Sequence, residues 1–307
     1  MACTCMTAED FAVLLDLIRP EMHSESRSRP EEVVAPPLGQ EFERNYRTKT
    51  LLNHIAGDAH NKEQKLIVWS TFSAKYLPQM VDRLLNLPTP MDNDGVPVDY
   101  AQDYVPCSPW YYMLLHIQYT PYLYKYLHSP HPLAASSKQL PQVMADRLAD
   151  AMDRWDGKLL NTRLDREMRG YYLDIVEGYL AVLNTLCVAF IRVEDRSTII
   201  NEATKKRLTT TLVDWMGRYR DERIGRQSKQ LCMFLSGLTN WDEWFHDIRR
   251  HYKNWEVCGF ANCNTRQGLK ACKRCQTVRY CSAEHQRFDW IGMGGIKHKH
   301  VCFETEY

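Results

Sequence analysis

Apolar residues recur every three or four positions along most of this chain, which is the spacing of one face of an α-helix. Hardly any stretch alternates apolar and polar residues with the period of two that is typical of strands. Pro78 is expected to break a helical segment in two, whereas Pro109 and Pro141 stand where helices begin. The expected helical segments are residues 1–20, 41–87, 109–127, 141–160, 165–193, 199–220 and 228–252.

Changes in this pattern divide the chain into regions. Residues 1–40 are predicted to be a short helix plus a flexible linker, because their second half is charged, rich in serine and arginine, and interrupted by prolines. Residues 41–252 are predicted to form an all-α domain, either a helical bundle or an irregular α-solenoid. A small module over residues 253–302 and a tail over residues 303–307 follow. The predicted fold class is therefore mainly α.

Composition limits the cellular compartments and the classes of partner that we expect for this protein. The chain has 307 residues, 44% of them hydrophobic, and a net charge of +1, so no global field favours nucleic acid or membrane. The start of the sequence lacks the basic region of a secretory signal. The longest apolar run, residues 179–190, is too short to span a bilayer and contains Asn184. We expect a protein of the cytoplasm, the nucleus or both, where thiols stay reduced.

The cysteines are concentrated in the C-terminal module. Six of the 11 cysteines fall within the last fifty residues, and residues 253–302 carry nine lysines or arginines against three acidic residues. So small a region cannot bury enough apolar surface to offset its chain entropy, and in a reducing compartment a metal is the expected stabiliser. The ligand-type residues are, in order, Cys258, Cys263, Cys272, Cys275, Cys281, His285, His298 and Cys302. Eight such ligands suit two tetrahedral zinc ions.

The spacing of these ligands supports zinc. Cys281 and His285 are four residues apart, and so are His298 and Cys302, so each pair can point at one ion from one face of a helix. His300 competes with His298 for the seventh ligand position. On a helix it would point away from the other ligands, yet the sequence leaves the choice between the two histidines open.

Residues 258–302 resemble a MYND zinc finger, with the sequence CGFANCNTRQGLKACKRCQTVRYCSAEHQRFDWIGMGGIKHKHVC. Several further positions match the family's pattern, some of them ligands and some not: Tyr280-Cys281-Ser282, Gln286, Asp289-Trp290 and His298-Lys299. The segment departs from the family in its wider first cysteine pair, in a histidine at position 285 where cysteine is commoner, and in a long gap after Trp290.

The resemblance implies two cross-braced zinc ions. One would be held by the set Cys258, Cys263, Cys281 and His285. The other would be held by the set Cys272, Cys275, His298 and Cys302. Because every ligand is a protein side chain, neither ion keeps an open position, and closed zinc sites of this kind are structural.

The function implied by the resemblance is protein–protein recognition. MYND fingers bind short proline-containing peptides, and Gln286 and Trp290 match the family residues that lie at the peptide groove. A tryptophan ring offers a flat face to proline, although Trp290 could also fill the small core between the zinc ions. We therefore expect a non-enzymatic adaptor that binds protein partners, serving transcriptional regulation or ubiquitin-ligase assembly.

Two other classes are disfavoured. MYND fingers also occur in SET-type protein lysine methyltransferases, which need an asparagine-histidine-x-cysteine run. In this chain Asn53 and His54 are followed by Ile55 and Ala56, and the sequence has neither a nucleotide-binding loop nor a nucleophile elbow. A nucleic-acid-binding zinc protein would fit the basic charge of the module, but no expected helix carries a run of base-reading arginine, asparagine and glutamine.

Overall fold

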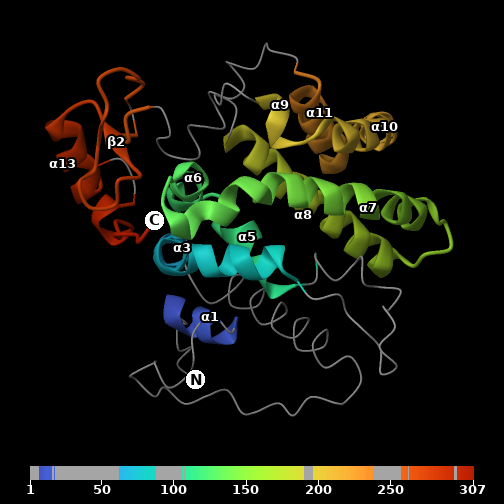
Figure 1. Cartoon of the computed structure of the whole chain (residues 1–307), viewed down its shortest axis with the longest axis horizontal. Helices are drawn as coiled ribbons and strands as arrows, with labels where there is room; N and C mark the ends of the chain where they lie inside the picture. Colours follow the sequence, from blue (N-terminus) through green and yellow to red (C-terminus); the bar gives the residue numbers. More distant parts are fainter. Residues whose placement is uncertain are drawn as a thin grey trace. The chain divides into compact units, whose positions relative to one another are not determined.

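The computed structural model confirms a mainly α fold with a small cysteine-rich segment at the C-terminal end (Figure 1). It describes residues 7–15, 17, 62–87, 106, 108–189, 196–237, 257–261, 263–293 and 296–307. The predicted linker and the predicted domain boundaries at residues 40 and 252 lie outside these ranges and stay predictions.

The chain divides into two compact units. Unit 1 comprises Met1–Val98, Cys107–Ser137 and Trp244–Tyr307. Unit 2 comprises Asp99–Pro106 and Lys138–Glu243. Helices from the first part of the chain therefore share a unit with the cysteine-rich segment, from which they are far removed in sequence.

The helical part of unit 1 is built around one long helix. This is α3 (Lys62–Leu85), which packs against α1 (Ala8–Leu14), α5 (Pro109–Ile117) and α6 (Pro121–His128). The amphipathic pattern of the N-terminal segment is borne out in α1, whose Phe11 side chain is buried. Burial of one apolar face against a neighbour is what stabilises a helix as short as α1.

Proline positions account for two differences from the expected helices. Pro78 lies inside α3 and does not break it, so that expectation was wrong. A proline in a helix removes one backbone hydrogen bond. Leu77 and Val81, fully buried on either side of Pro78, pack both halves of α3 into the core. By contrast, residues 109–127 form two helices, because Pro121 starts a new one after Thr120.

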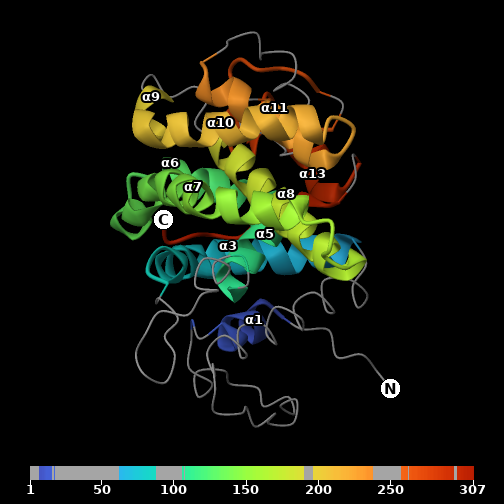
Figure 2. The same ribbon diagram turned by 90° about the vertical axis from the view of Figure 1, so that its right-hand side faces the viewer.

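Unit 2 is a helical bundle. Its long helices are α7 (Leu140–Leu160), α8 (Arg166–Ala189), α10 (Glu202–Arg218) and α11 (Arg223–Leu235). Both α7 and α11 pack against α8 and α10, so the contacts close into a ring, as in a bundle and unlike a solenoid. Figures 1 and 2 show α7 and α8 as one layer of the unit, with α10 and α11 as the next. The short helix α9 (Arg196–Ile199) precedes α10, and the 3₁₀ segment η3 (Pro132–Gln139), most of which belongs to unit 1, precedes α7.

The helix α8 is the one described helix that is long and apolar enough to cross a membrane. However, 67% of its most apolar stretch is buried inside the structure, with Val182 and Leu183 fully enclosed. The core helix of a globular bundle has the same length and composition.

The cysteine-rich segment contains little regular structure. Strand β1 (Lys270–Ala271) pairs antiparallel with β2 (Arg279–Tyr280), and α13 (Ala283–Ile291) follows directly. Ser282 caps α13 by accepting a hydrogen bond from the His285 N–H. A short 3₁₀ turn, η4 (His298–His300), precedes the last residues.

Candidate metal centres

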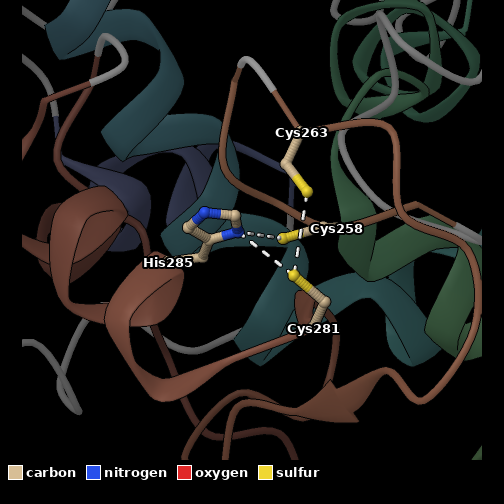
Figure 3. A group of neighbouring side chains, drawn as sticks. All are labelled: Cys258, Cys263, Cys281 and His285. Carbon is tan, nitrogen blue, oxygen red and sulfur yellow. Dashed lines mark hydrogen bonds between the residues drawn. The ribbon is translucent and has the colours of Figure 1, made fainter.

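The first group of ligand-type side chains brings together Cys258, Cys263, Cys281 and His285 (Figure 3). Their four ligand atoms lie within 4.8 Å of one another. The His285 Nδ1 atom is 3.5 Å from the Cys258 Sγ atom and 3.1 Å from the Cys281 Sγ atom. The sulfur atoms of Cys263 and Cys281 are 3.7 Å apart. This is the first of the two sets that the family resemblance implied.

Local structure holds these side chains in place. Cys281 follows β2, and His285 lies in the first turn of α13, where the Ser282 hydroxyl fixes its backbone. The Phe260 ring stacks on the His285 imidazole with ring centroids 4.8 Å apart, which limits rotation of the imidazole. The Cys263 N–H donates a hydrogen bond to the Phe260 carbonyl, which closes the turn between the first two cysteines.

The second group contains Cys272, Cys275, His298 and Cys302, and all four are buried. The Cys275 Sγ atom is 3.6 Å from the His298 Nε2 atom, and the sulfurs of Cys272 and Cys302 are 3.7 Å apart. The Gln276 N–H donates to the Cys272 carbonyl at 2.9 Å, closing the turn of the CxxC pair. This is the second implied set.

The ligand-to-ligand distances fit tetrahedral zinc. Zinc–sulfur bonds of about 2.3 Å at tetrahedral angles place two sulfurs about 3.8 Å apart, and a sulfur and an imidazole nitrogen about 3.6 Å apart. The sulfur–sulfur distances of 3.7 Å in both groups, and the sulfur–nitrogen distances of 3.5 Å and 3.6 Å, agree with these values, whereas the Cys281–His285 distance of 3.1 Å is shorter. Three thiolates and one imidazole in each group fit two structural zinc ions and leave neither ion an open position.

The electrostatics of the second group favour a bound cation. The Cys302 thiol, and after it His298 and Thr277, lower the pKa of Cys275 to about 3 by hydrogen bonding, although burial opposes this. The same contact with Cys275, together with burial, raises the pKa of Cys302. Neighbouring thiols thus compete to ionise, and a bound metal ion would allow all of them to be thiolates together.

Comparison with protein-family models assigns this segment. The model described as the MYND finger matches residues 258–302. These residues form a MYND finger. The finger is a zinc-binding module, and MYND fingers generally mediate protein interactions. No curated protein and no solved structure matches the chain.

The two candidate histidines of the MYND finger have different surroundings. His298 is buried within the second group, whereas the His300 Nδ1 atom lies 3.1 Å from a carboxylate oxygen of Glu63 on α3. The 3₁₀ turn directs the two imidazoles to different sides. The structure thus places His298, and not His300, among the ligands.

The MYND finger is anchored to the helices of unit 1 through Tyr122 of α6. Its hydroxyl donates to the Val301 carbonyl at 2.7 Å and accepts from the Phe303 N–H at 2.7 Å, on either side of the ligand Cys302. Tyr122 and Ala74 belong to the same buried cluster as four of the zinc ligands, so the core of the finger continues into α3 and α6.

The last residues of the described chain complete this anchoring. Tyr307 is buried, and its hydroxyl donates to the Ser73 carbonyl at 2.8 Å. Lys125 of α6 donates to the Thr305 hydroxyl at 2.7 Å and lies 3.4 Å from the Cys275 carbonyl. Residues 303–307, which the sequence pattern presented only as a tail, are therefore part of the packing. Sequence reasoning missed these contacts, because tyrosines in an aromatic run carry no signal of which partner they meet.

The predicted peptide-binding residues both lie on α13. Gln286 and Trp290 are half-buried and four residues apart, so they share one face of the helix. Trp290 packs against the buried cluster and meets the His298 ring edge to face at 5.8 Å. It therefore contributes to the small core and still presents part of its ring to solvent.

Asp289, between these two positions in the family pattern, has a different role. Its side chain is buried and accepts a hydrogen bond of 2.7 Å from the Tyr280 hydroxyl. Burial, and next the neighbouring Asp289 carboxylate, raise the pKa of Tyr280, so the phenol stays protonated and donates. This bond ties α13 to β2 and fixes the orientation of the helix.

Proposed function

We propose that this protein is a non-enzymatic adaptor whose MYND finger binds proline-containing peptides of partner proteins. The observation that carries the proposal is the closure of both metal sites. With three thiolates and one imidazole around each ion, no position remains for water or substrate, so the metals act by shaping a surface.

The surface best suited to a peptide is the exposed side of α13 around Trp290. A proline ring packs well against a flat indole, and a peptide already in the polyproline conformation loses little entropy on binding. Ile291 and Met293, which follow this tryptophan in sequence, are 51% and 62% exposed. Gln286, one turn earlier, supplies an amide that can hydrogen-bond the peptide backbone. An apolar patch with a polar neighbour is typical of a peptide-binding surface.

The remaining parts of the proposal concern context. The helices outside the finger would bind a second partner, and the complex would serve transcriptional regulation or ubiquitin-ligase assembly in the cytoplasm, the nucleus or both. The absence of catalytic motifs from the sequence supports a role without catalysis. Partners would be proteins, with neither nucleic acid nor membrane required.

The test is peptide binding by the full-length, zinc-loaded protein. An array of proline-containing peptides is probed with wild type and with Gln286→Ala and Trp290→Ala, and zinc content verifies that each variant is folded. Gln267→Ala is the matched control, because Gln267 is an exposed glutamine of the same finger away from α13. We expect both α13 variants to lose binding and the control to keep it. Unchanged binding by Trp290→Ala would remove the proposed peptide surface.

A further inference from the structure

A second candidate binding surface lies between α6 and the turn that follows the CxxC pair of the finger. It is a groove of about 540 Å³, here called the knuckle groove, and all of its residues belong to unit 1. Besides hydroxyl-bearing Tyr124, Ser129 and Tyr307, its polar side chains are those of Lys125, His128, His131, Gln276, Thr277 and Arg279. The volume is that of a pocket for a few residues of a peptide. We propose that the knuckle groove binds a phosphorylated segment of a partner protein.

The charges of the groove select the ligand. Lys125 and Arg279 provide two basic side chains, and His128 and His131 add two imidazoles, while no aspartate or glutamate side chain lines the groove. A phosphorylated side chain carries a charge of about −1.5 to −2 at neutral pH, which matches two cations, whereas a carboxylate carries only one. Arginine clusters recognise phosphate through paired hydrogen bonds.

The donors of the groove are held in position. The His131 Nδ1 atom accepts a hydrogen bond from the Leu133 N–H at 3.3 Å, so the neutral ring carries its proton on Nε2 and donates from there. Lys125 is fixed by the Thr305 hydroxyl and lies 6.0 Å from the centre of the Tyr307 ring. Donors that are already ordered lose less entropy when a ligand binds.

The backbone at Gln276 supplies a second observation. Gln276 has φ 57°, the one positive value outside glycine among the residues that the structure describes. Glycine adopts this conformation without penalty, and non-glycine residues in it cluster at functional sites. The side chain of Gln276 lines the groove and adds an amide donor beside Arg279. A ligand that accepts hydrogen bonds explains why a side chain is present at this position.

This inference does not depend on the proposed function. The knuckle groove and the α13 surface share no residue, so Gln286→Ala, which removes a half-buried amide of α13, is expected to leave phosphopeptide binding unchanged. One surface can therefore fail its test while the other passes.

The experiment measures binding to the full-length, zinc-loaded protein by fluorescence polarisation. The probes are a degenerate peptide library with a central phosphoserine and two matched libraries with serine or glutamate at the centre. We expect saturable binding of the phosphoserine library, weaker by about tenfold or more for both other libraries. Arg279→Gln should weaken phosphoserine binding by about tenfold or more, because it removes the bidentate donor. Arg287→Gln, which removes the same charge from an exposed position on α13, should leave it unchanged.

A second variant separates recognition from folding. Gln276→Gly suits the backbone conformation, so zinc content and thermal stability should be kept while phosphopeptide binding weakens. Equal weakening by Arg279→Gln and Arg287→Gln would show non-specific attraction and overturn the proposal. Equal affinity for the phosphoserine and glutamate libraries would also overturn the proposal. So would an RNA oligonucleotide, or phosphoinositide vesicles, that bind more tightly than the phosphoserine library and lose this binding in Arg279→Gln. If Arg279→Gln loses zinc, the test uses Arg279→Lys instead. This variant should retain zinc and bind the phosphoserine library more weakly than wild type does. An affinity equal to that of wild type would refute the proposal.

Discussion

Tyr122 and Val301 are 179 residues apart in sequence, yet the tyrosine hydroxyl donates a hydrogen bond of 2.7 Å to the valine carbonyl. The same oxygen accepts a bond from the Phe303 N–H, so Tyr122 holds the backbone on both sides of the zinc ligand Cys302. A buried phenol that both donates and accepts satisfies two main-chain groups that would otherwise be desolvated without a partner. Zinc binding and the packing of α6 are thereby linked.

Tyr122→Phe should destabilise the protein by about 1–3 kcal/mol, because the Phe303 N–H and the Val301 carbonyl each lose a hydrogen bond to the phenol. Urea unfolding measures the stability, and competition with a chelator measures whether zinc is released more readily. Tyr126→Phe is the matched control on the same helix. The Tyr126 hydroxyl is buried and has no hydrogen-bond partner among the described residues, so its removal should be neutral or stabilising. Equal losses in both variants would contradict the anchoring role of Tyr122.

Cys275→Ser should reduce the zinc content from two ions per chain to one or fewer. Serine is a poor zinc ligand, and the two ligand sets alternate along the chain, so loss of one ion loosens the segments that hold the other. Elemental analysis of the purified protein gives the stoichiometry. Cys232→Ser, at a cysteine of unit 2, should keep both ions. Two ions retained by Cys275→Ser would refute the ligand assignment.

His298→Ala and His300→Ala should differ sharply. His298→Ala removes a buried ligand and should release the second zinc, whereas His300→Ala removes only a partly exposed contact with Glu63 and should change stability by less than about 1 kcal/mol. Zinc content and thermal unfolding of the two variants distinguish these outcomes. Zinc loss from His300→Ala alone would mean that His300, and not His298, is the ligand.

His116 should make stability depend on pH. Burial, and next the charge of Lys65, lower its pKa from 6.5 to about 4, and its ring stacks on Trp69. Since the unfolded chain binds this proton more tightly than the folded chain, the contribution of neutral His116 to the free energy of unfolding is complete above pH 6.5. It is lost as the pH falls towards 4. The loss is on the order of 2–3 kcal/mol.

Urea unfolding between pH 4.5 and pH 7.5 tests this effect in wild type and in His116→Phe, which keeps an aromatic ring against Trp69. The variant should show a flatter dependence on pH than wild type, and the difference between the two curves isolates His116 from other acid-sensitive groups. Parallel curves would show that His116 does not contribute.

Much of the helical structure could be predicted, since it depends on neighbours in sequence, and the division of the eight ligands into two sets followed from the resemblance to the MYND family. Apolar spacing predicted the helix at residues 141–160 almost to its ends. The expectation that each four-residue ligand pair shares one helix face was wrong, because Cys281 precedes the N-cap Ser282 of α13 and Cys302 follows the short turn η4. Pro78 was misjudged, because its tolerance within α3 depends on buried neighbours that a local rule does not include. Tyr122 could be recognised as aromatic and packed, but its partner could not be named.

By itself, the sequence determined that the C-terminal segment would bind two tetrahedral metal ions and that the chain before it would be mainly helical, because the type and number of ligands and the helical periodicity can both be recognised without the tertiary structure. Only the tertiary structure decided that His298 is a ligand while His300 meets Glu63, and that the last residues pack on α3 and α6. It also decided that Arg279 and His131 line one groove. These outcomes depend on which segments, far apart in sequence, pack against each other and exclude water. No short sequence pattern contains that information.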